Sequence, residues 1–356
     1  MQKKITDIKE NKGQNGNFLF SVILSSLIMK LSPQILSFKG YDAAPLKRVF
    51  LDEKYSYPFA CEMEEVAQQE NFAIGQTYDC IKWAQDDKVI IERNSKPFLV
   101  SNGKASNALF SQMRYQFGID SAREYGFTVG GNTFIGKYPN GKKWLMLGEN
   151  EKKRVQNLDD ITSVYDVDIK NVFFIPQQDF HLDMFLRPIG YPYVLVNDPE
   201  LVRENIKKYS NEGIFSEELL QTFEKFDTFQ KKHYSTCDKV CKRLESLGFK
   251  PIRIAGVYSD SLNFMNALVN KHPDGKISYI TNSSECVSNQ NISNVQKVFE
   301  QDLRSLVPNL DKIYFIKGRD SEYYYPNENY MMATLQSGSG GLHCMSLEEP
   351  DFSTWA

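Results

Sequence analysis

Cysteine and histidine are both scarce in this sequence. Six cysteines and four histidines occur among 356 residues. Small secreted domains held together by disulfides are far denser in cysteine, so this class is excluded and most of the thiols are expected to be buried and reduced. With so few histidines, any histidine that lies close to an acid or to a cysteine stands out as a candidate for chemistry.

An excess of charge of one sign is also missing. The chain has 42 Lys and Arg against 45 Asp and Glu, a formal net charge of −3. Nucleic-acid-binding domains usually carry a basic stripe, so no nucleic-acid partner is expected. The hydrophobic share of 41% is enough for a large core, in one big domain or two ordinary ones.

No apolar run reaches the length of a membrane span. The run Phe18–Leu31 is shorter than the about 20 residues that such a helix needs. A Lys-containing polar stretch precedes it, as in an export signal, but that stretch carries Asp7 and Glu10 and no small-residue cleavage site follows. We therefore predict an N-terminal extension over 1–40 with an apolar core or lid helix, no membrane partner and a cytoplasmic location. An export signal, and so secretion, is the alternative.

Strand and helix patterns alternate through the rest of the chain. Two hairpins are predicted, one turning at Asn94-Ser95 and one at 139–141, after Gly130-Gly131-Asn132. Further strands are predicted at 46–51, 172–175, 193–196, 251–254, 276–280 and 312–316, and helices at 62–70, 217–247 and 295–306. This pattern indicates an α/β or α+β architecture, with a single domain over 41–356 and a helical insertion at about 199–247. No sequence repeat is visible, so any repeat has to be structural.

Three short runs carry groups suited to catalysis. Cys344 follows Gly340-Gly341, glycines that let the backbone approach a ligand closely, and a thiolate is a competent nucleophile. In a strand, His181 and Asp183 would lie on the same face, with the histidine able to move protons and the acid able to orient it or hold a cation. Trp83 and Asp86 could grip a planar cation by stacking and paired hydrogen bonds. Taken alone, the cysteine run is equally compatible with a tight turn that holds a buried thiol. The other two runs, each taken alone, favour chance polar residues on a strand and a solvated turn with two acids.

The ordered set of motifs resembles the pentein, or guanidino-group-modifying, superfamily, most of all the agmatine deiminases and the bacterial peptidylarginine deiminases. Those enzymes carry an aromatic-x-Arg-Asp run, an acid-Gly-Gly turn, a His-x-Asp strand and a C-terminal Gly-Gly-x-x-Cys. The corresponding pieces here are Trp83–Asp86, Val129–Asn132, His181–Asp183 and Gly340–Cys344, in the same order over most of the chain.

The resemblance implies a fold, an activity and a set of roles. The fold would be a five-bladed β/α propeller of ββαβ-type units, and no metal or organic cofactor would be needed. Cys344 would attack the guanidinium carbon of agmatine or an arginine derivative, and His181 would move the protons. Asp86 and Asp183 would hold the guanidinium nitrogens, with the other substrate-binding residues being Trp83, Gly130, Gly131 and Asn132. The partner would be a guanidine-containing small molecule or a protein arginine, with a homodimer as an option.

Two positions depart from the family pattern. Val129 stands where an additional glutamate is usual, and Gln85 replaces the arginine of Arg-Asp. Glu124 is a nearby acid that could take the place of the missing one. These departures keep open a non-catalytic pentein that binds a guanidinium ligand or a protein partner. An amidinotransferase of the same fold is a second alternative, because the run His181–Gly190 followed by Tyr193–Asn197 also resembles the amidinotransferase version of that strand.

One other cluster is a weaker candidate. His233, Cys237 and Cys241 are spaced by four residues on a predicted helix and could share one face. A metal site needs a further ligand, usually from another segment. We therefore interpret these residues as a helix face that carries two buried thiols.

Overall fold

A computed structural model describes residues 44–79, 82–103, 105–124, 128–155, 157–211, 221, 224, 234–259, 262–283, 292–307, 309–318 and 340–355. All of them belong to one compact unit, Gly40–Ala356. The predicted N-terminal extension with its apolar run, and His233, lie outside the described residues. The division into an extension and one catalytic domain therefore stays a prediction.

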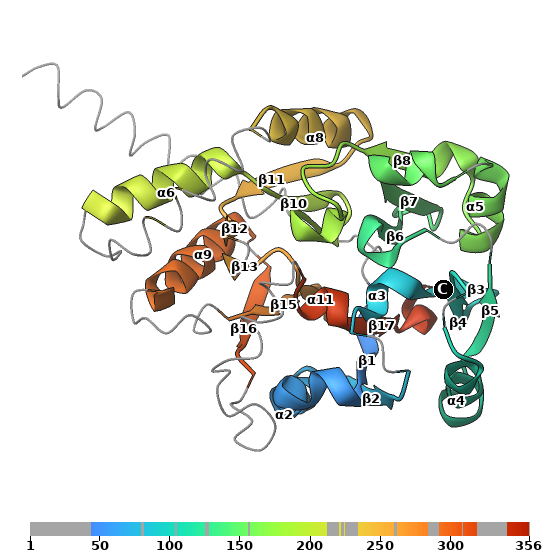
Figure 1. The fold of residues 1–356 in the computed structure, drawn as a ribbon. Coiled ribbons are helices and arrows are strands. Elements are labelled where there is room, and N and C mark those ends of the chain that lie inside the picture. Colours follow the sequence, from blue (N-terminus) through green and yellow to red (C-terminus); the bar gives the residue numbers. More distant parts are fainter. Residues whose placement is uncertain are drawn as a thin grey trace, which may run out of the picture. The chain divides into compact units, whose positions relative to one another are not determined.

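Five three-stranded sheets share one connection pattern within the described residues (Figure 1). In each, an antiparallel pair is followed by a helical crossover to a third strand that lies parallel to the second. The sheets are β3 (Lys88–Arg93), β4 (Lys96–Ser101), β5 (Asp120–Arg123); β6 (Thr133–Lys137), β7 (Lys143–Gly148), β8 (Val172–Ile175); β9 (Leu186–Gly190), β10 (Tyr193–Asn197), β11 (Lys250–Ile254); β14 (Leu268–Lys271), β15 (Ile277–Asn282), β16 (Leu310–Ile316); and β17 (Ser346–Pro350), β1 (Leu46–Asp52), β2 (Ala73–Thr77). The repeat is thus structural, as the absence of a sequence repeat required.

The crossovers are helical in all five units of the described chain. They are α4 (Asn107–Phe117), α5 (Leu158–Tyr165), α6 (Pro199–Asn211) with α8 (Tyr234–Ser246), α9 (Ile292–Leu306) and α2 (Glu53–Glu70). The predicted insertion at 199–247 therefore occupies the crossover between β10 and β11. The fifth unit joins the two ends of the domain, because β17 pairs with β1.

Local chemistry explains several boundaries. Asn94 and Ser95 both have positive φ, as the tight turn between β3 and β4 requires, and this predicted hairpin is confirmed. The hairpin of β6 and β7 is confirmed as well. Helix α2 starts earlier than the predicted 62–70, because the Asp52 carboxylate accepts a hydrogen bond from the backbone N–H of Lys54 and caps the helix.

The prediction of a strand at His181–Asp183 is wrong. His181 is extended but is followed by the 3-10 turn η4 (Leu182–Met184), and the strand of this unit, β9, begins only at Leu186. The run after Trp83 is the short helix α3 (Ala84–Asp87), and Cys344 lies on another, α11 (Leu342–Met345). Shorter elements complete the chain: β12 (Val257–Ser259), β13 (Leu262–Asn263), and the 3-10 turns η1 (Gly130–Asn132), η2 (Glu149–Lys153), η3 (Ile169–Asn171) and η6 (Phe352–Trp355).

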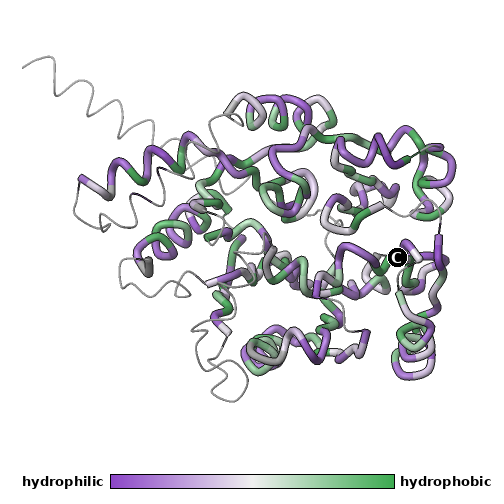
Figure 2. Tube along the Cα trace, viewed as in Figure 1, coloured by the Kyte–Doolittle hydropathy of each residue, from purple (hydrophilic) through white to green (hydrophobic). Residues whose placement is uncertain are grey.

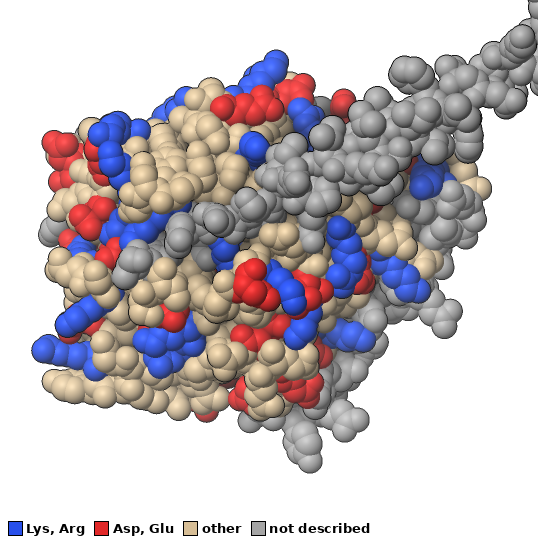
Figure 3. Space-filling view, turned by 180° about the vertical axis from the view of Figure 1, so that it is seen from behind, with Lys and Arg blue, Asp and Glu red and all other residues tan. Residues whose placement is uncertain are grey.

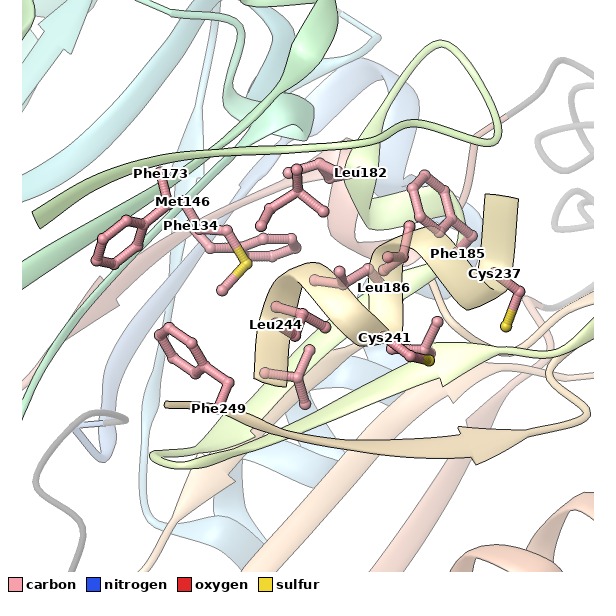
Figure 4. Packing of buried hydrophobic residues seen from close by; sticks show 14 of the residues in the cluster. Phe134, Met146, Phe173, Leu182, Phe185, Leu186, Cys237, Cys241, Leu244 and Phe249 are labelled. Carbon is pink, nitrogen blue, oxygen red and sulfur yellow. The ribbon is translucent and has the colours of Figure 1, made fainter. Parts of the chain in front are cut away.

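Helix α8 packs its apolar face against β8, β10 and β11. Cys237, Cys241 and Leu244 contribute to one core cluster with Leu186 and Phe249 (Figure 4). Figure 2 shows the corresponding mixture of apolar and polar stretches along the crossover helices. The two cysteines are therefore core side chains, as interpreted from the sequence.

The first strands of the five sheets meet at one cavity of about 110 Å³. Each strand contributes lining residues, among them Ile90, Phe134, Arg187, Val269 and Glu348. The architecture is α/β, as predicted, and no sheet closes on itself among the described residues. The arrangement of the five units as propeller blades stays a prediction.

Charged residues of both signs are mixed on the face seen in Figure 3. Among the helices that the structure describes, none is both long and apolar enough to cross a membrane.

Candidate active site

Cys344 is buried on α11, and asparagine side chains fix the start of this helix. Asn282 Oδ1 accepts a hydrogen bond from the backbone N–H of Leu342 at 2.9 Å. Asn266 Oδ1 accepts one from the backbone N–H of Cys344 at 3.2 Å, while its Nδ2 donates to the Cys344 sulfur at 3.0 Å. A single asparagine thus holds both the backbone and the side chain of the cysteine.

The two glycines before α11 are needed for close packing. A Cβ at Gly340 would lie 2.3 Å from the Trp83 ring, and one at Gly341 would lie 2.5 Å from Asn282 Nδ2. Both contacts are far inside van der Waals distance, so any side chain would displace Trp83 or the asparagine cap. Trp83 therefore packs as a wall beside α11, and α3, which follows it, contacts α11 (Figure 1).

Asp183 lies next to the sulfur. Its Oδ2 is 3.2 Å from Cys344 Sγ and 2.8 Å from His343 Nδ1. The side chain has no exposed surface, and its second oxygen, Oδ1, has no hydrogen-bond partner among the described residues. A buried carboxylate oxygen without a donor is costly, so this atom is suited to accept a hydrogen bond from a ligand.

His181 lies close to Asp183 and to the sulfur, with one ring nitrogen within 4.8 Å of both. Its Nδ1 lies 3.6 Å from Asp86 Oδ1, and a Cβ on Gly131 would lie 2.6 Å from that nitrogen. Gly130 is also restricted, because a Cβ there would lie 2.0 Å from the backbone oxygen of Gln85. Because Gly130 and Gly131 have no side chains, η1 can pack closely against α3 and His181.

Burial and negative charge oppose ionisation of the thiol. Burial raises the pKa of Cys344 well above its usual value, and the carboxylates of Asp183 and Asp86 raise it further. For Asp183, burial alone would raise the pKa, but the hydrogen bond and the charge of His343 outweigh it and hold the pKa below its usual value. The free site is thus a protonated thiol beside an ionised carboxylate. A cation that binds there would offset the negative charge and favour the thiolate.

A ring nitrogen of His181, a carboxylate oxygen of Asp183 and the Cys344 sulfur lie within 4.8 Å of one another. Histidine, carboxylate and cysteine are also zinc ligands, so this set could hold a metal ion. However, the sulfur and Asp183 are already at hydrogen-bond distance, and Asp183 Oδ2 is shared with His343. These contacts also suit a nucleophile, a proton carrier and an orienting acid.

Other predicted residues have different surroundings. The Asn132 amide is used within the protein: it donates to Glu151 at 2.9 Å and accepts from Gln177 at 2.8 Å and from the backbone N–H of Leu182 at 3.1 Å. It therefore supports the turn that carries Asp183. Glu124 accepts a hydrogen bond from Arg93 at 3.2 Å.

Three residues near Cys344 were not predicted from the sequence: Asn266, Asn282 and His343. Asn266 lies between β13 and β14, far from the motifs along the chain, and asparagine is common in loops, so the sequence offered no specific signal. His343 could have been suspected, because it is next to Cys344 and is one of only four histidines.

The sequence comparisons give no relative: no family model and no curated protein match this chain. The structure, in contrast, is similar to solved structures. The agmatine deiminase of C. jejuni is 13% identical with a TM-score of 0.50, over 88% of this chain and 98% of the other. A provisionally named arginine deiminase of Porphyromonas gingivalis is 13% identical with a TM-score of 0.51, over 88% and 98%. A provisionally named agmatine deiminase is 11% identical with a TM-score of 0.52, over 87% and 94%.

The chain has a pentein fold. The resemblance inferred from the motifs is confirmed for the fold, and the similarity covers nearly the whole of each of these structures. At these low identities the similarity establishes the fold alone, and the activity has to be argued from the residues of the site.

Proposed function

We propose that this pentein is a hydrolase of guanidinium groups that uses a covalent cysteine intermediate. One observation carries the proposal: Cys344, His181 and Asp183 are buried together, with their reactive atoms within 4.8 Å of one another. The Asp183 Oδ1 atom has no donor among the described residues and can accept a hydrogen bond from a ligand. A planar cation with several N–H donors matches the two acids near the thiol, Asp183 and Asp86.

The first step is formation of the covalent adduct. A guanidinium held by Asp86 and Asp183 neutralises part of the charge that opposes thiol ionisation. The thiol of Cys344 gives its proton to His181, and the sulfur adds to the guanidinium carbon. His181 donates a proton to one nitrogen, the carbon–nitrogen bond breaks, and ammonia leaves. The product of this step is an amidino thioether on Cys344.

Hydrolysis completes the cycle. His181 takes a proton from a water molecule, the water oxygen bonds to the same carbon, and the carbon–sulfur bond breaks. The substrate leaves with oxygen in place of one imine nitrogen, and Asn266 stabilises the departing sulfur by its hydrogen bond. Side chains of the chain supply the nucleophile, the proton transfers and the cation binding in both half-reactions, so the proposed reaction uses no metal or organic cofactor.

The substrate class is agmatine or an arginine derivative, either a small molecule or a protein arginine. Agmatine and arginine deiminases among the similar structures support a guanidine substrate. Val129 adds no carboxylate at the position where the family usually has one, and Glu124 is paired with Arg93. We therefore propose a site with two acids for the guanidinium.

The five ββαβ units support a propeller in which the cavity lined by their first strands marks the central axis. In this arrangement the site residues come from η4, α3, α11 and the segment before β14, near that axis.

Mass spectrometry of agmatine, free arginine and arginine peptides after incubation with the enzyme tests the proposal. A gain of about one mass unit, oxygen for imine, with release of ammonia and transient labelling of Cys344, supports hydrolysis. Transfer of the amidino group to an added amine would instead identify an amidinotransferase. No turnover or labelling with any guanidine would contradict catalysis.

A further inference from the structure

A line of alternating charged side chains runs from the Cys344 sulfur toward the cavity. Asp183 Oδ2 lies 3.2 Å from the sulfur and 2.8 Å from His343 Nδ1. On the other side of the ring, His343 Nε2 lies 3.6 Å from Glu348 Oε1, and Arg187 donates to the same Glu348 oxygen at 2.8 Å. The four side chains come from η4, α11, β17 and β9.

His343 has a carboxylate against each of its ring nitrogens. An ionised carboxylate only accepts hydrogen bonds, whereas a neutral imidazole has one N–H and one bare nitrogen. In a neutral ring one nitrogen lone pair would therefore face a negative oxygen inside the protein. The side chain is 5% exposed, so bulk solvent screens this repulsion little. The His343 ring also lies beside the ring of Phe134, with the two centroids 6.0 Å apart.

We propose that His343 carries a proton on both ring nitrogens and is a buried positioning residue of the active site, held between Asp183 and Glu348. The inference deepens the proposed function and rests on it for its catalytic meaning. As a fixed cation, His343 keeps Asp183 ionised and holds its Oδ2, so that Oδ1 is aimed at the ligand. It also offsets the Asp183 charge, so less negative charge opposes formation of the thiolate.

Arg187, at the end of the series away from Cys344, pairs with Glu348 and favours its ionised form. Arg187 is 6% exposed and lies over the Phe134 ring at 5.5 Å from its centroid. Because each charge in the series has a neighbour of opposite sign, burial is tolerable although single buried charges are costly. On the ligand side of Asp183, the titratable neighbours are His181, Asp86 and Cys344 itself.

Nitrogen NMR of the histidine rings tests the proposal in the complete protein. The chain has four histidines, and His343→Gln identifies the signals of that ring. We expect both ring nitrogens of His343 to have the shifts of imidazolium at pH 7.5 in the wild type. A neutral ring there overturns the proposal, and this outcome needs no variant at Glu348.

Glu348→Gln removes the outer carboxylate and should move part of the His343 signal toward the neutral form. The matched control is Glu349→Gln, the next residue of β17, whose buried carboxylate pairs with Lys47 and Arg48 instead. The control should leave the His343 ring unchanged, even where it lowers thermal stability. An equal response to both variants would assign the ring's state to general destabilisation and overturn the role of Glu348.

Kinetics give the second readout. Where wild type turns over a guanidine, Glu348→Gln should lower kcat by about tenfold with a smaller change in KM, as for loss of one nearby charge that acts through His343. Unchanged kcat beside an altered ring signal would show that the charge does not serve catalysis. If the wild type turns over no guanidine, the proposed function fails, while the ring spectrum still decides the state of His343.

Discussion

Asp86→Asn should have opposite effects on the two properties of Cys344. The negative charge of Asp86 helps to raise the pKa of the thiol, so its removal lowers that pKa and increases the thiolate fraction at a given pH. The same change removes an acceptor that we propose for the guanidinium. The variant should therefore have a more reactive thiol but a slower enzymatic reaction.

The size of the effect follows from the geometry. Asp86 is 3.6 Å from His181, and a nitrogen of that ring is within 4.8 Å of the sulfur. A unit charge at roughly 10 Å contributes about 1.7 kcal/mol at an effective dielectric constant of about 20. Asp86 is 33% exposed, so solvent screening reduces this contribution. We expect alkylation of Cys344 to become about three- to tenfold faster below its pKa.

The assay is the rate of iodoacetamide modification of the Cys344 peptide at pH 8, followed by mass spectrometry, which separates it from the exposed Cys61. Asp87→Asn is the matched control: this neighbouring carboxylate accepts from Asn102 at 2.8 Å. It should leave the rate unchanged. A slower or unchanged rate in Asp86→Asn would refute the electrostatic account of the thiol.

Three further predictions concern the surroundings of the site. Chelators should leave turnover unchanged, whereas added zinc should inhibit by occupying His181 and Cys344; loss of activity in chelator would favour a metal enzyme. Gly131→Ala should lower kcat by about a hundredfold, because the new Cβ displaces His181, while far-ultraviolet circular dichroism stays native. Val129→Glu should lower KM for a guanidine by about tenfold by adding an acceptor; an unchanged KM would show that this position does not face the substrate.

Much of the fold could be predicted because its signals are local. Hairpins such as that at Asn94-Ser95 depend on a few turn residues, and the alternation of strands with amphipathic helices indicated the architecture. The ββαβ repeat itself was not visible in the sequence, because each unit needs only apolar strands and an amphipathic helix, which many sequences satisfy.

The site could be predicted only in part. The ordered motifs predict four site residues, and the structure brings them together: Cys344, His181, Asp183 and Asp86. The supposed strand at His181 is a turn, since the backbone is held by Asn132, a long-range contact that periodicity cannot reveal.

The residues that hold Cys344 and Asp183 could not be predicted from the sequence either, because they also act through long-range contacts. Asn266 and His343 gain their meaning from contacts with the sulfur and with Asp183, respectively. Asp183 is distant from His343 in sequence, as Asn266 is from Cys344, so neither pair forms a motif.

The most direct test of the account is turnover of guanidines by wild type and by Cys344→Ala, measured as ammonia release and as the mass of the product. The account predicts release of ammonia, a product with oxygen in place of one imine, and an amidino adduct on Cys344 in the wild type alone. Turnover that persists in Cys344→Ala, or its absence in both proteins with every guanidine, would contradict it.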